Sequence, residues 1–121
     1  MVMSKIFYII SVSIDLSGIS IWKGKVFPFK KVIECDLPNC DFTSCDLNAC
    51  HFNASILKGC VFDRNTIFKS CKFINVDLSE RNDLKGLSLQ GVDFSGSNLS
   101  SCDLSSCNLS SCNLNGVNLK G

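Results

Sequence analysis

The sequence predicts an all-β solenoid, in which the chain winds in square coils that stack along one axis. Two observations predict this fold. From Cys35 onward a large apolar residue recurs every five positions, and all seventeen of these residues are Leu or Phe. The position two residues before each of them is mostly small or compact, and it holds all nine cysteines of the chain. A period of five belongs neither to an α-helix nor to a simple strand.

A five-residue period fits a chain that makes one short extended step and then turns. Four such steps close a square coil of about 20 residues, and the coils stack at the strand spacing of about 4.8 Å. The large residue (the centre) and the residue two before it (the slot) point inward, because residues i and i+2 share one face of a strand. The residue between them is mostly Asp or Asn and points outward. The length predicts about four coils.

The period breaks twice, once after Phe62 and once after Leu78, each time by one extra residue. We expect these insertions, near Arg64–Asn65 and Glu80–Arg81, to be corner bulges, with Asn82 in the inward slot that follows the second one. Counting by fours then stacks the centres on shared faces: Phe52, Phe73, Phe94 and Leu114 on one face, and Leu37, Leu57, Leu78, Leu99 and Leu119 on another.

The two ends of the chain differ. We expect residues 1–33 to form an apolar cap, partly strand, because an uncovered first coil would offer a free strand edge; residues 34–121 form the repeat domain. The basic residues of the cap are expected to be a solvated surface: Lys23, Lys25, Lys30 and Lys31. The last coil has no cap, which leaves Leu114 and Leu119 near solvent. Either the chain is a fragment, or this end pairs with a second copy as a homodimer.

The units CDLSS, CNLSS, VNLKG and VDFSG resemble those of the pentapeptide-repeat family. The resemblance covers residues 35–121 and implies a right-handed quadrilateral β-helix. This sequence departs from the family pattern by placing cysteine where alanine is most common in the family. Because cysteine is also a compact hydrophobe, the departure changes the packing volume and leaves the architecture as it is.

The chemistry of the repeat favours a protein without catalytic activity, cofactor or metal. His51 is the single histidine and occupies an outward position; its neighbour Cys50 points the opposite way, so the two make a poor nucleophile pair. Cys40 stacked over Cys60 suits packing better than a metal site. The net charge of +1 and the absence of an 18-residue apolar stretch exclude a strongly basic nucleic-acid binder and a transmembrane segment. We expect a cytoplasmic protein with reduced thiols, or alternatively a secreted bacterial effector with a weak N-terminal signal.

Three functions remain open. The first is a protein-binding scaffold, which the resemblance extends to a bacterial effector or adaptor. The second, implied by family members that confer quinolone resistance, is a DNA-mimicking inhibitor or protector of DNA gyrase. The outward Asp41, Asp83 and Asp103 would then form its acidic face, although residues 35–121 carry a net charge of only −2. The third is a structural segment of a longer protein.

Overall fold

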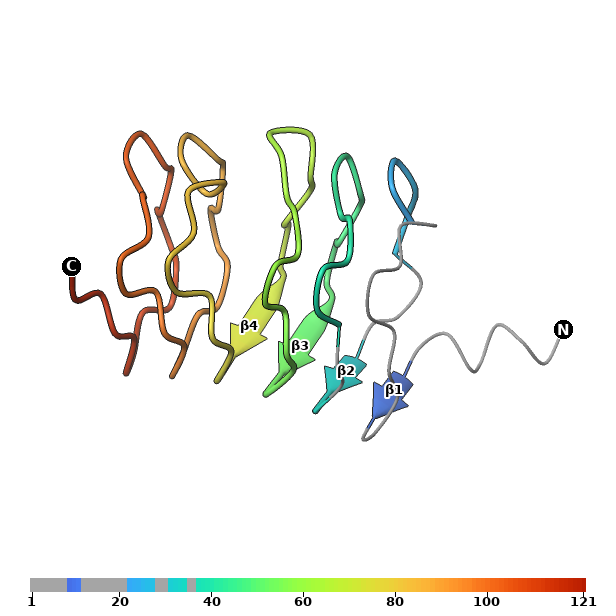
Figure 1. Ribbon diagram of the computed structural model, residues 1–121, viewed down its shortest axis with the longest axis horizontal. Helices are drawn as coiled ribbons and strands as arrows, with labels where there is room; N and C mark the ends of the chain where they lie inside the picture. The colour runs from blue at the N-terminus through green and yellow to red at the C-terminus, as the bar shows by residue number, and fades with distance from the viewer. Residues whose placement is uncertain (1–8, 12–21, 28–30, 35–36) are drawn as a thin grey trace, which may run out of the picture.

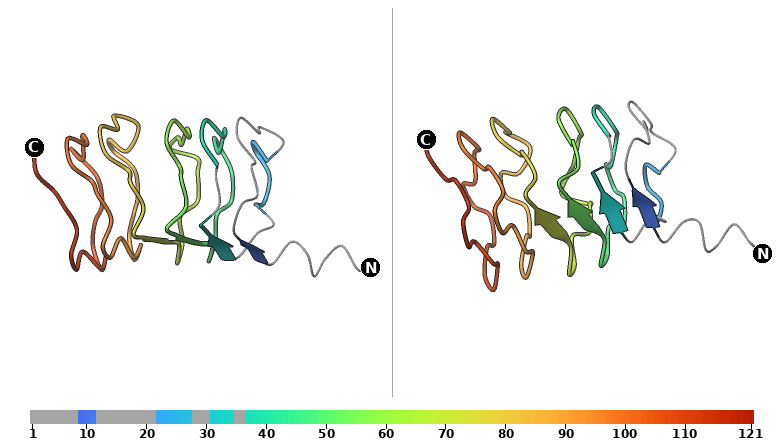
Figure 2. Two further views of the ribbon diagram at one scale, coloured as in Figure 1. Left: turned by 60° about the horizontal axis from the view of Figure 1, so that its bottom comes forward. Right: turned by 90° about the horizontal axis from the view of Figure 1, so that it is seen from below.

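The computed structural model describes residues 9–11, 22–27, 31–34 and 37–121, and they wind as a stack of β-coils with β1 and the C-terminal residue at opposite ends of the stack (Figure 1). Four short strands run parallel along one side in the order β1-β2-β3-β4. Figure 2 shows the same side from below, with each strand in a successive coil. The strand bounds are Ile9–Ser11 (β1), Lys31–Ile33 (β2), His51–Asn53 (β3) and Lys72–Ile74 (β4).

The described coils have four faces, called A to D, with the strands on face A. Coil 1 contains residues 37–54, coil 2 contains 55–75, coil 3 contains 76–96 and coil 4 contains 97–116. Phe52 pairs with Phe73 in the parallel register, and isolated bridges continue the pairing beyond the strands. The centres stack as follows: Val32, Phe52, Phe73, Phe94 and Leu114 on face A; Leu37, Leu57, Leu78, Leu99 and Leu119 on face B; Phe42, Phe62, Leu84 and Leu104 on face C; and Phe27, Leu47, Phe68, Leu89 and Leu109 on face D.

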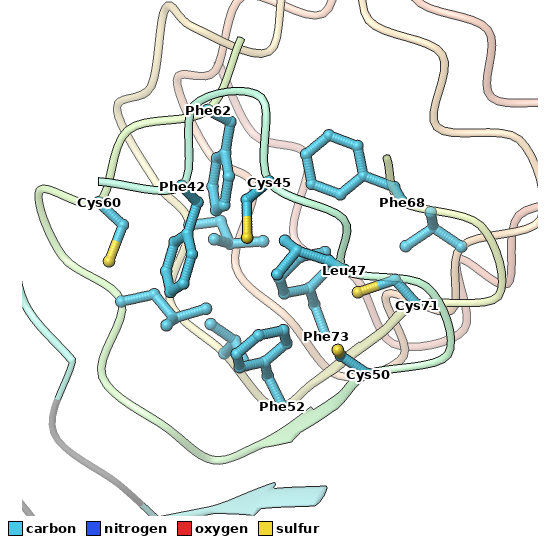
Figure 3. Packing of buried hydrophobic residues seen from close by; sticks show 14 of the residues in the cluster. Phe42, Cys45, Leu47, Cys50, Phe52, Cys60, Phe62, Phe68, Cys71 and Phe73 are labelled. Carbon is cyan, nitrogen blue, oxygen red and sulfur yellow. The ribbon is translucent and has the colours of Figure 1, made fainter. Parts of the chain in front are cut away.

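The core is a continuous column of these centres and of the slots beside them. Phe73 stacks between Phe52 and Phe94, with ring centroids 5.3 Å and 5.8 Å away, which confirms the predicted aromatic ladder (Figure 3). Each fully buried Leu or Phe contributes about 1.5–3 kcal/mol through removal of its apolar surface from water. The column therefore holds the coils together.

The slot residues contribute hydrogen bonds as well as volume. The thiol of Cys60 donates to the carbonyl oxygen of Leu37, one coil earlier, and the hydroxyl of Thr66 donates to that of Phe42. The same bond recurs for several other slots along the stack: Ser55, Ser97, Cys102, Cys107 and Cys112. Cysteine, serine and threonine are thus interchangeable here because each is small and carries one donor.

Most corners are turns whose third residue has positive φ. In the turn after Phe42, Ser44 has φ 55° and the N–H of Cys45 donates to the carbonyl oxygen of Phe42; this is a type II turn. The outward Asp or Asn caps such turns, as when Asp41 accepts a hydrogen bond from the N–H of Thr43. The same i to i+2 cap recurs at Asp46, Asp77, Asp93, Asn98, Asp103, Asn108, Asn113 and Asn118.

Both insertions lie at corners, as predicted, but the second is arranged differently from the prediction. Arg64 and Asn65 are exposed in a turn that the N–H of Thr66 closes onto the carbonyl oxygen of Asp63. At the second insertion Asn82 is exposed, and the prediction that it fills the inward slot is wrong. Arg81 points inward instead, with only 9% of its side chain exposed, because Asp83 and the carbonyl oxygen of Cys60 accept its hydrogen bonds there.

The cap predicted for residues 1–33 lies mostly outside the described residues, as do Lys30 and Cys35, so its boundary stays a prediction. The described part of this segment continues the coil pattern: Val26 bridges Asp46, and Phe27 is fully buried against Trp22 and Phe42. Among the described residues there is no helix long and apolar enough to cross a membrane.

Candidate functional site: the outward layer and the seam

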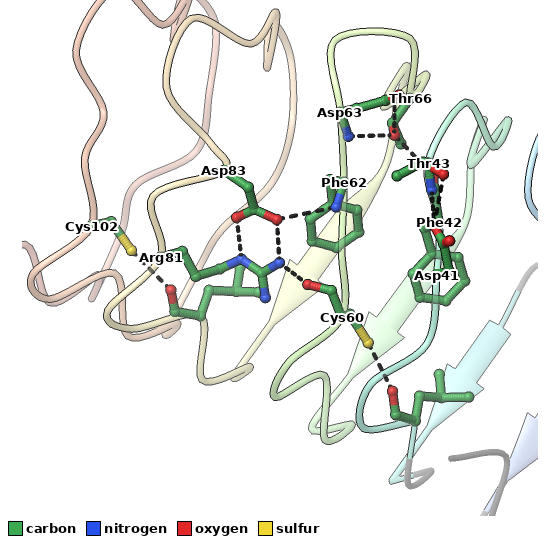
Figure 4. Close-up of polar contacts among 12 residues, drawn as sticks. Asp41, Phe42, Thr43, Cys60, Phe62, Asp63, Thr66, Arg81, Asp83 and Cys102 are labelled. Atoms are coloured by element: carbon green, nitrogen blue, oxygen red, sulfur yellow. Dashed lines mark hydrogen bonds and ion pairs between the residues drawn. The ribbon is translucent and has the colours of Figure 1, made fainter. Parts of the chain in front are cut away.

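The acidic residues predicted to share a face do so. Asp41 bridges Val61 on face C, and the N–H of Asp103 donates to the carbonyl oxygen of Arg81 at the start of the same face one coil earlier. Figure 4 shows Asp83 on face C between these two levels. Asp41, Asp83 and Asp103 therefore form one ladder of carboxylates along face C, with Val61 in the place of a fourth.

Each of these carboxylates has a cation or hydrogen-bond donors beside it. The hydroxyl and N–H of Thr43 lower the pKa of Asp41, and Lys23 lies 3.7 Å from its carboxylate. The hydroxyl and N–H of Ser105 lower the pKa of Asp103. Asp83 is bound by the guanidinium of Arg81. The cations Lys23 and Arg81 therefore offset the charge of Asp41 and Asp83, whereas the hydrogen bonds at Asp103 leave that carboxylate negatively charged.

Coil 2 differs from the other described coils in its outward residues. At the positions where coils 3 and 4 mostly carry turn-capping Asp or Asn, coil 2 carries Ile56 on face B, Val61 on face C and Ile67 on face D. Their exposed fractions are 54%, 45% and 49%. We call these three residues the apolar belt. Val26 on face D, exposed near the N-terminal end, is a further outward aliphatic residue.

The junction between coils 2 and 3, called the seam, lacks the backbone ladder that joins the other coils. Seven backbone hydrogen bonds join residues 37–50 to residues 56–70, and seven join residues 77–91 to residues 98–111. Within residues 37–121, all of which are described, no backbone hydrogen bond or bridge joins 56–70 to 77–91. The ladder resumes on face A, where the N–H of Phe73 donates to the carbonyl oxygen of Asp93. Faces B, C and D are therefore open at the seam, whereas face A is closed.

The two insertions explain the seam. The extra residue of coil 2 falls after the face C centre, whereas that of coil 3 falls before it. Phe62 and Leu84 are therefore 22 residues apart, whereas Phe42 and Phe62 are 20 apart. The ladder forms only where equivalent residues of successive coils lie directly opposite each other. The two extra residues between Phe62 and Leu84 shift coil 3 relative to coil 2 on face C, so these residues are no longer in register.

Two side chains replace the missing hydrogen bonds on face C, and we call them the clip. Arg81 donates to both carboxylate oxygens of Asp83, at 2.9 Å and 2.7 Å, and also to the carbonyl oxygen of Cys60 (Figure 4). Asp83 accepts the N–H of Phe62 at 3.1 Å. In a regular coil, the carbonyl oxygen of Cys60 and the N–H of Phe62 would both bond to the backbone of the next coil. The guanidinium also lies over the Phe62 ring, 4.7 Å from its centroid, a favourable cation–π position.

The seam opens to solvent as two hollows. One, of about 810 Å³, lies at the corner between faces B and C and is lined by residues that include Lys58, Glu80, Arg81 and Asp83. The other, of about 590 Å³, lies along face D and is lined by Ile67, Lys69, Ser88 and Gln90 among others. Neither hollow reaches through the column, because the centres on both sides of the seam remain buried.

His51 and the buried thiols of Cys45 and Cys60 are poorly suited to nucleophilic chemistry. Burial, with Lys72 and Lys31 beside it, lowers the pKa of His51. Burial raises the pKa of the Cys45 thiol to about 12, and a hydrogen bond with Cys40, together with burial, raises that of Cys60. The contact between Cys40 and Cys60 follows from their predicted stacking. Among the described residues, no group of three or more His, Cys, Asp or Glu side chains is placed to hold a metal ion.

Comparison with known proteins identifies the family. The pentapeptide-repeat model matches residues 32–64 and 83–121 in eight copies, and the chain belongs to this family. No curated protein matches the chain. Among solved structures, it is similar to the pentapeptide-repeat protein Rfr23 from the cyanobacterium Cyanothece 51142, with 26% identity and a TM-score of 0.62, over 71% of this chain and 57% of that one.

A second similar structure is a trypsin-treated form of QnrB1, a plasmid-mediated fluoroquinolone resistance protein. Its identity is 22% and its TM-score 0.59, over 80% of this chain and 48% of that one. The chain thus spans about half the length of these two solved relatives. At this identity the likeness to QnrB1 shows the fold alone, which is the right-handed quadrilateral β-helix of the family.

Proposed function

We propose that the chain is a non-enzymatic protein-binding module that uses the side of the rod around coil 2. The observation that carries the proposal is the apolar belt. An aliphatic residue at an outward position gives up the turn cap that Asp or Asn supplies there, and it leaves apolar surface in water. That this happens on three successive faces of one coil favours a role outside the fold.

The shape of the belt restricts the partner. Ile56, Val61 and Ile67 lie on three different faces, so a flat surface could contact only the residues at one corner. A partner that wraps around the rod would contact all three. Each buried aliphatic side chain would add about 1.5–3 kcal/mol at most, and such residues typically act as central anchors with polar residues around them.

The test replaces the belt by the residue that the fold itself uses. The variant Ile56→Asn, Val61→Asn, Ile67→Asn should fold, because Asn caps the equivalent turns of coil 4. A matched control adds Asn98→Ile, Asp103→Val and Asn108→Ile to that variant, which moves the two Ile and the Val of the belt to coil 4 and replaces one Asp of the native chain by Asn. Proteins captured by the native chain from cells are identified, purified and titrated against all three forms.

We expect a genuine partner to bind the native chain at least about tenfold more tightly than the belt variant, with no recovery in the control. Equal affinity of a purified partner for all three forms would contradict the proposal. Recovery in the control would show that apolar surface alone suffices, and it would also count against a specific site on coil 2.

The alternative function, DNA mimicry toward DNA gyrase, rests on the carboxylate ladder of face C. Mimicry of a duplex needs dense free negative charge, and the cations beside Asp41 and Asp83 reduce it. A gyrase supercoiling assay with and without a quinolone tests this alternative. If the native chain inhibits gyrase or rescues it from the drug, and the double variant Asp41→Lys, Asp103→Lys does not, DNA mimicry becomes the favoured function. If the folded native chain has no effect, DNA mimicry is excluded.

We also propose the homodimer that the sequence leaves as one of two alternatives, formed end to end through the C-terminal edge that carries Leu114 and Leu119. The supporting observation is the exposure of Leu114 (37%) and Leu119 (51%). Sedimentation velocity at increasing concentration tests it. A dimer that Leu114→Asn and Leu119→Asn dissociate supports this pairing, and a monomer at all concentrations excludes it.

A further inference from the structure

The seam divides the rod into two stacks that are connected differently on opposite sides. On face A, both hydrogen bonds of the bridge between Lys72 and Asp93 are formed: the N–H of Phe73 donates to the carbonyl oxygen of Asp93, and the N–H of Asp93 donates to that of Cys71. The corner that follows adds one from the N–H of Asn75 to the carbonyl oxygen of Ser95. Faces B and D, although fully described here, have no backbone bond across the seam. A pair of stacks bonded along one side only can rotate about that side.

The interior agrees with this asymmetry. On face A the Phe73 ring stacks on Phe94 across the seam with an interplanar angle of 14°. On face C the stack from Phe42 to Phe62, parallel to within 11°, is followed by the guanidinium of Arg81 and not by another ring. On the side opposite the continuous aromatic stack, the polar groups of the clip therefore take the place of a stacked ring beside the buried Phe62 and Leu84. Water can replace these polar groups when they separate.

We propose that the rod is jointed at the seam: its two stacks pivot about face A, and the Arg81–Asp83 clip holds the joint closed on face C. The joint is a property of the fold itself and is independent of the proposed partner. Opening breaks no backbone ladder, because none is formed there. It separates the guanidinium from the Phe62 ring and from the carbonyl oxygen of Cys60, and it releases the N–H of Phe62 from Asp83.

Such an opening is a sub-global motion of the kind that occurs where backbone bonds are few and hydrogen-bonding groups face solvent. Its direction is fixed by the structure: distances that span the seam on the face C side change, whereas those that span it on face A do not. Since the hollows lie on faces B to D, opening enlarges them and leaves the aromatic stack of face A in place.

The experiment measures both sides at once. Nitroxides are attached through keto amino acids, which avoids the nine native cysteines. One pair replaces Lys23 and Ser105, which lie by the corner after face C, and the other replaces Lys31 and Asn113 on face A. All four positions are exposed and lie in different stacks within each pair. Distance distributions come from pulsed electron paramagnetic resonance.

The native chain should give a broader distribution for the face C pair than for the face A pair. Arg81→Met, which keeps the side-chain length and removes the charge, should widen the face C distribution at least about twofold and leave the face A distribution unchanged. Arg81→Lys, which retains the charge without the two-pronged geometry, should lie between them. It also serves as the informative variant if the Met variant does not fold.

Asp46→Asn provides the matched control, because it removes a charge from coil 1 while keeping a capping oxygen for the N–H of Asn48. It should change neither distribution. Narrow and equal distributions for both pairs, unaltered by either substitution of Arg81, would overturn the joint and show a rigid rod. Equal broadening on both sides would show general loosening and would overturn it as well.

Discussion

Two neighbouring junctions in this molecule, the seam and the junction between coils 3 and 4, are built from the same repeat but bonded in different ways. Coils 3 and 4 are joined by a backbone ladder on faces A, B and D, and their outward residues are mostly Asp and Asn. At the seam, the ladder is absent on three faces, and the Arg81–Asp83 ion pair takes its place on face C. Coil 2, on the N-terminal side of the seam, carries the apolar belt.

The comparison shows where a repeat protein acquires individual features. Between coils 3 and 4, the outward residues mostly cap the turns beside an intact ladder. The insertions leave coils 2 and 3 without a ladder between them on three faces. Polar clips, hollows and exposed aliphatic residues then become compatible with the fold, and these are the features that distinguish one surface from another.

The largest effect should come from the aromatic stack that crosses both kinds of junction. Phe73→Ala removes a ring that contacts Phe52, Phe94, Phe62 and Phe68, and it should lower the free energy of unfolding by about 3–5 kcal/mol. Leu119→Ala, at a half-exposed position, should cost less than about 1 kcal/mol. Urea denaturation measures both. If Phe73→Ala lowered the free energy of unfolding by less than about 1 kcal/mol, as expected for Leu119→Ala, the result would contradict a continuous core.

The clip should come next, and it sharpens the contrast between the junctions. Arg81→Met removes the guanidinium from the carbonyl oxygen of Cys60 and from the carboxylate of Asp83, which keeps only the N–H of Phe62, and it should cost about 2 kcal/mol. Lys23→Met removes an exposed ion pair with Asp41 and should change the free energy of unfolding by no more than about 0.5 kcal/mol. Similar values for the two variants would mean that the clip is an ordinary surface pair.

A smaller effect should separate capped from uncapped turns. Asn108→Ala removes a cap from coil 4 and should cost about 0.5–1 kcal/mol. Val61→Asn adds a capping oxygen to coil 2 and should leave the free energy of unfolding within about 0.5 kcal/mol of its native value. Thermal unfolding followed by circular dichroism compares them. A large loss for Val61→Asn would show that the belt stabilises the fold itself.

The smallest effect concerns acid. Hydrogen bonds from Ser79 lower the pKa of Asp77 from its ordinary value of 3.8, and those from Thr43 do the same for Asp41. A lowered folded-state pKa adds stability that is complete above the ordinary value and is lost as the pH falls through the folded value. The midpoint temperature of thermal unfolding should therefore fall as the pH is lowered from about pH 4, and it should fall less in Asp77→Asn. An unchanged decline in that variant would contradict this assignment.

The fold could be predicted from the sequence because the five-residue period specifies the coil, and the aromatic ladder of Phe52, Phe73 and Phe94 followed from counting. The role of the outward Asp and Asn as turn caps was missed, although their position two residues before the turn N–H, as in Asp41 and Thr43, is a readable signal. The hydrogen bonds of the slot side chains were also missed. The shared donor of Cys, Ser and Thr at that position could have revealed them.

The seam could be predicted only in part. The family model leaves out residues 65–82, and the distance from Phe62 to Leu84 already exceeds that of a regular coil. Spacing alone, however, cannot say which of Arg81 and Asn82 occupies the inward slot. An inward Arg81 is costly unless Asp83, Cys60 and the Phe62 ring lie around it, and that environment exists only once the coils are stacked.

The central claim is that the backbone ladder is interrupted at the seam and intact on both sides of it. Scalar couplings across hydrogen bonds, measured by nuclear magnetic resonance between amide nitrogen and carbonyl carbon, test it bond by bond. Couplings are expected from Leu47 to Ile67, from Leu89 to Asn108 and from Phe73 to Asp93, and none is expected from Phe68 to Ser88. A coupling from Phe68 to Ser88 as strong as that from Leu47 to Ile67 would contradict the account.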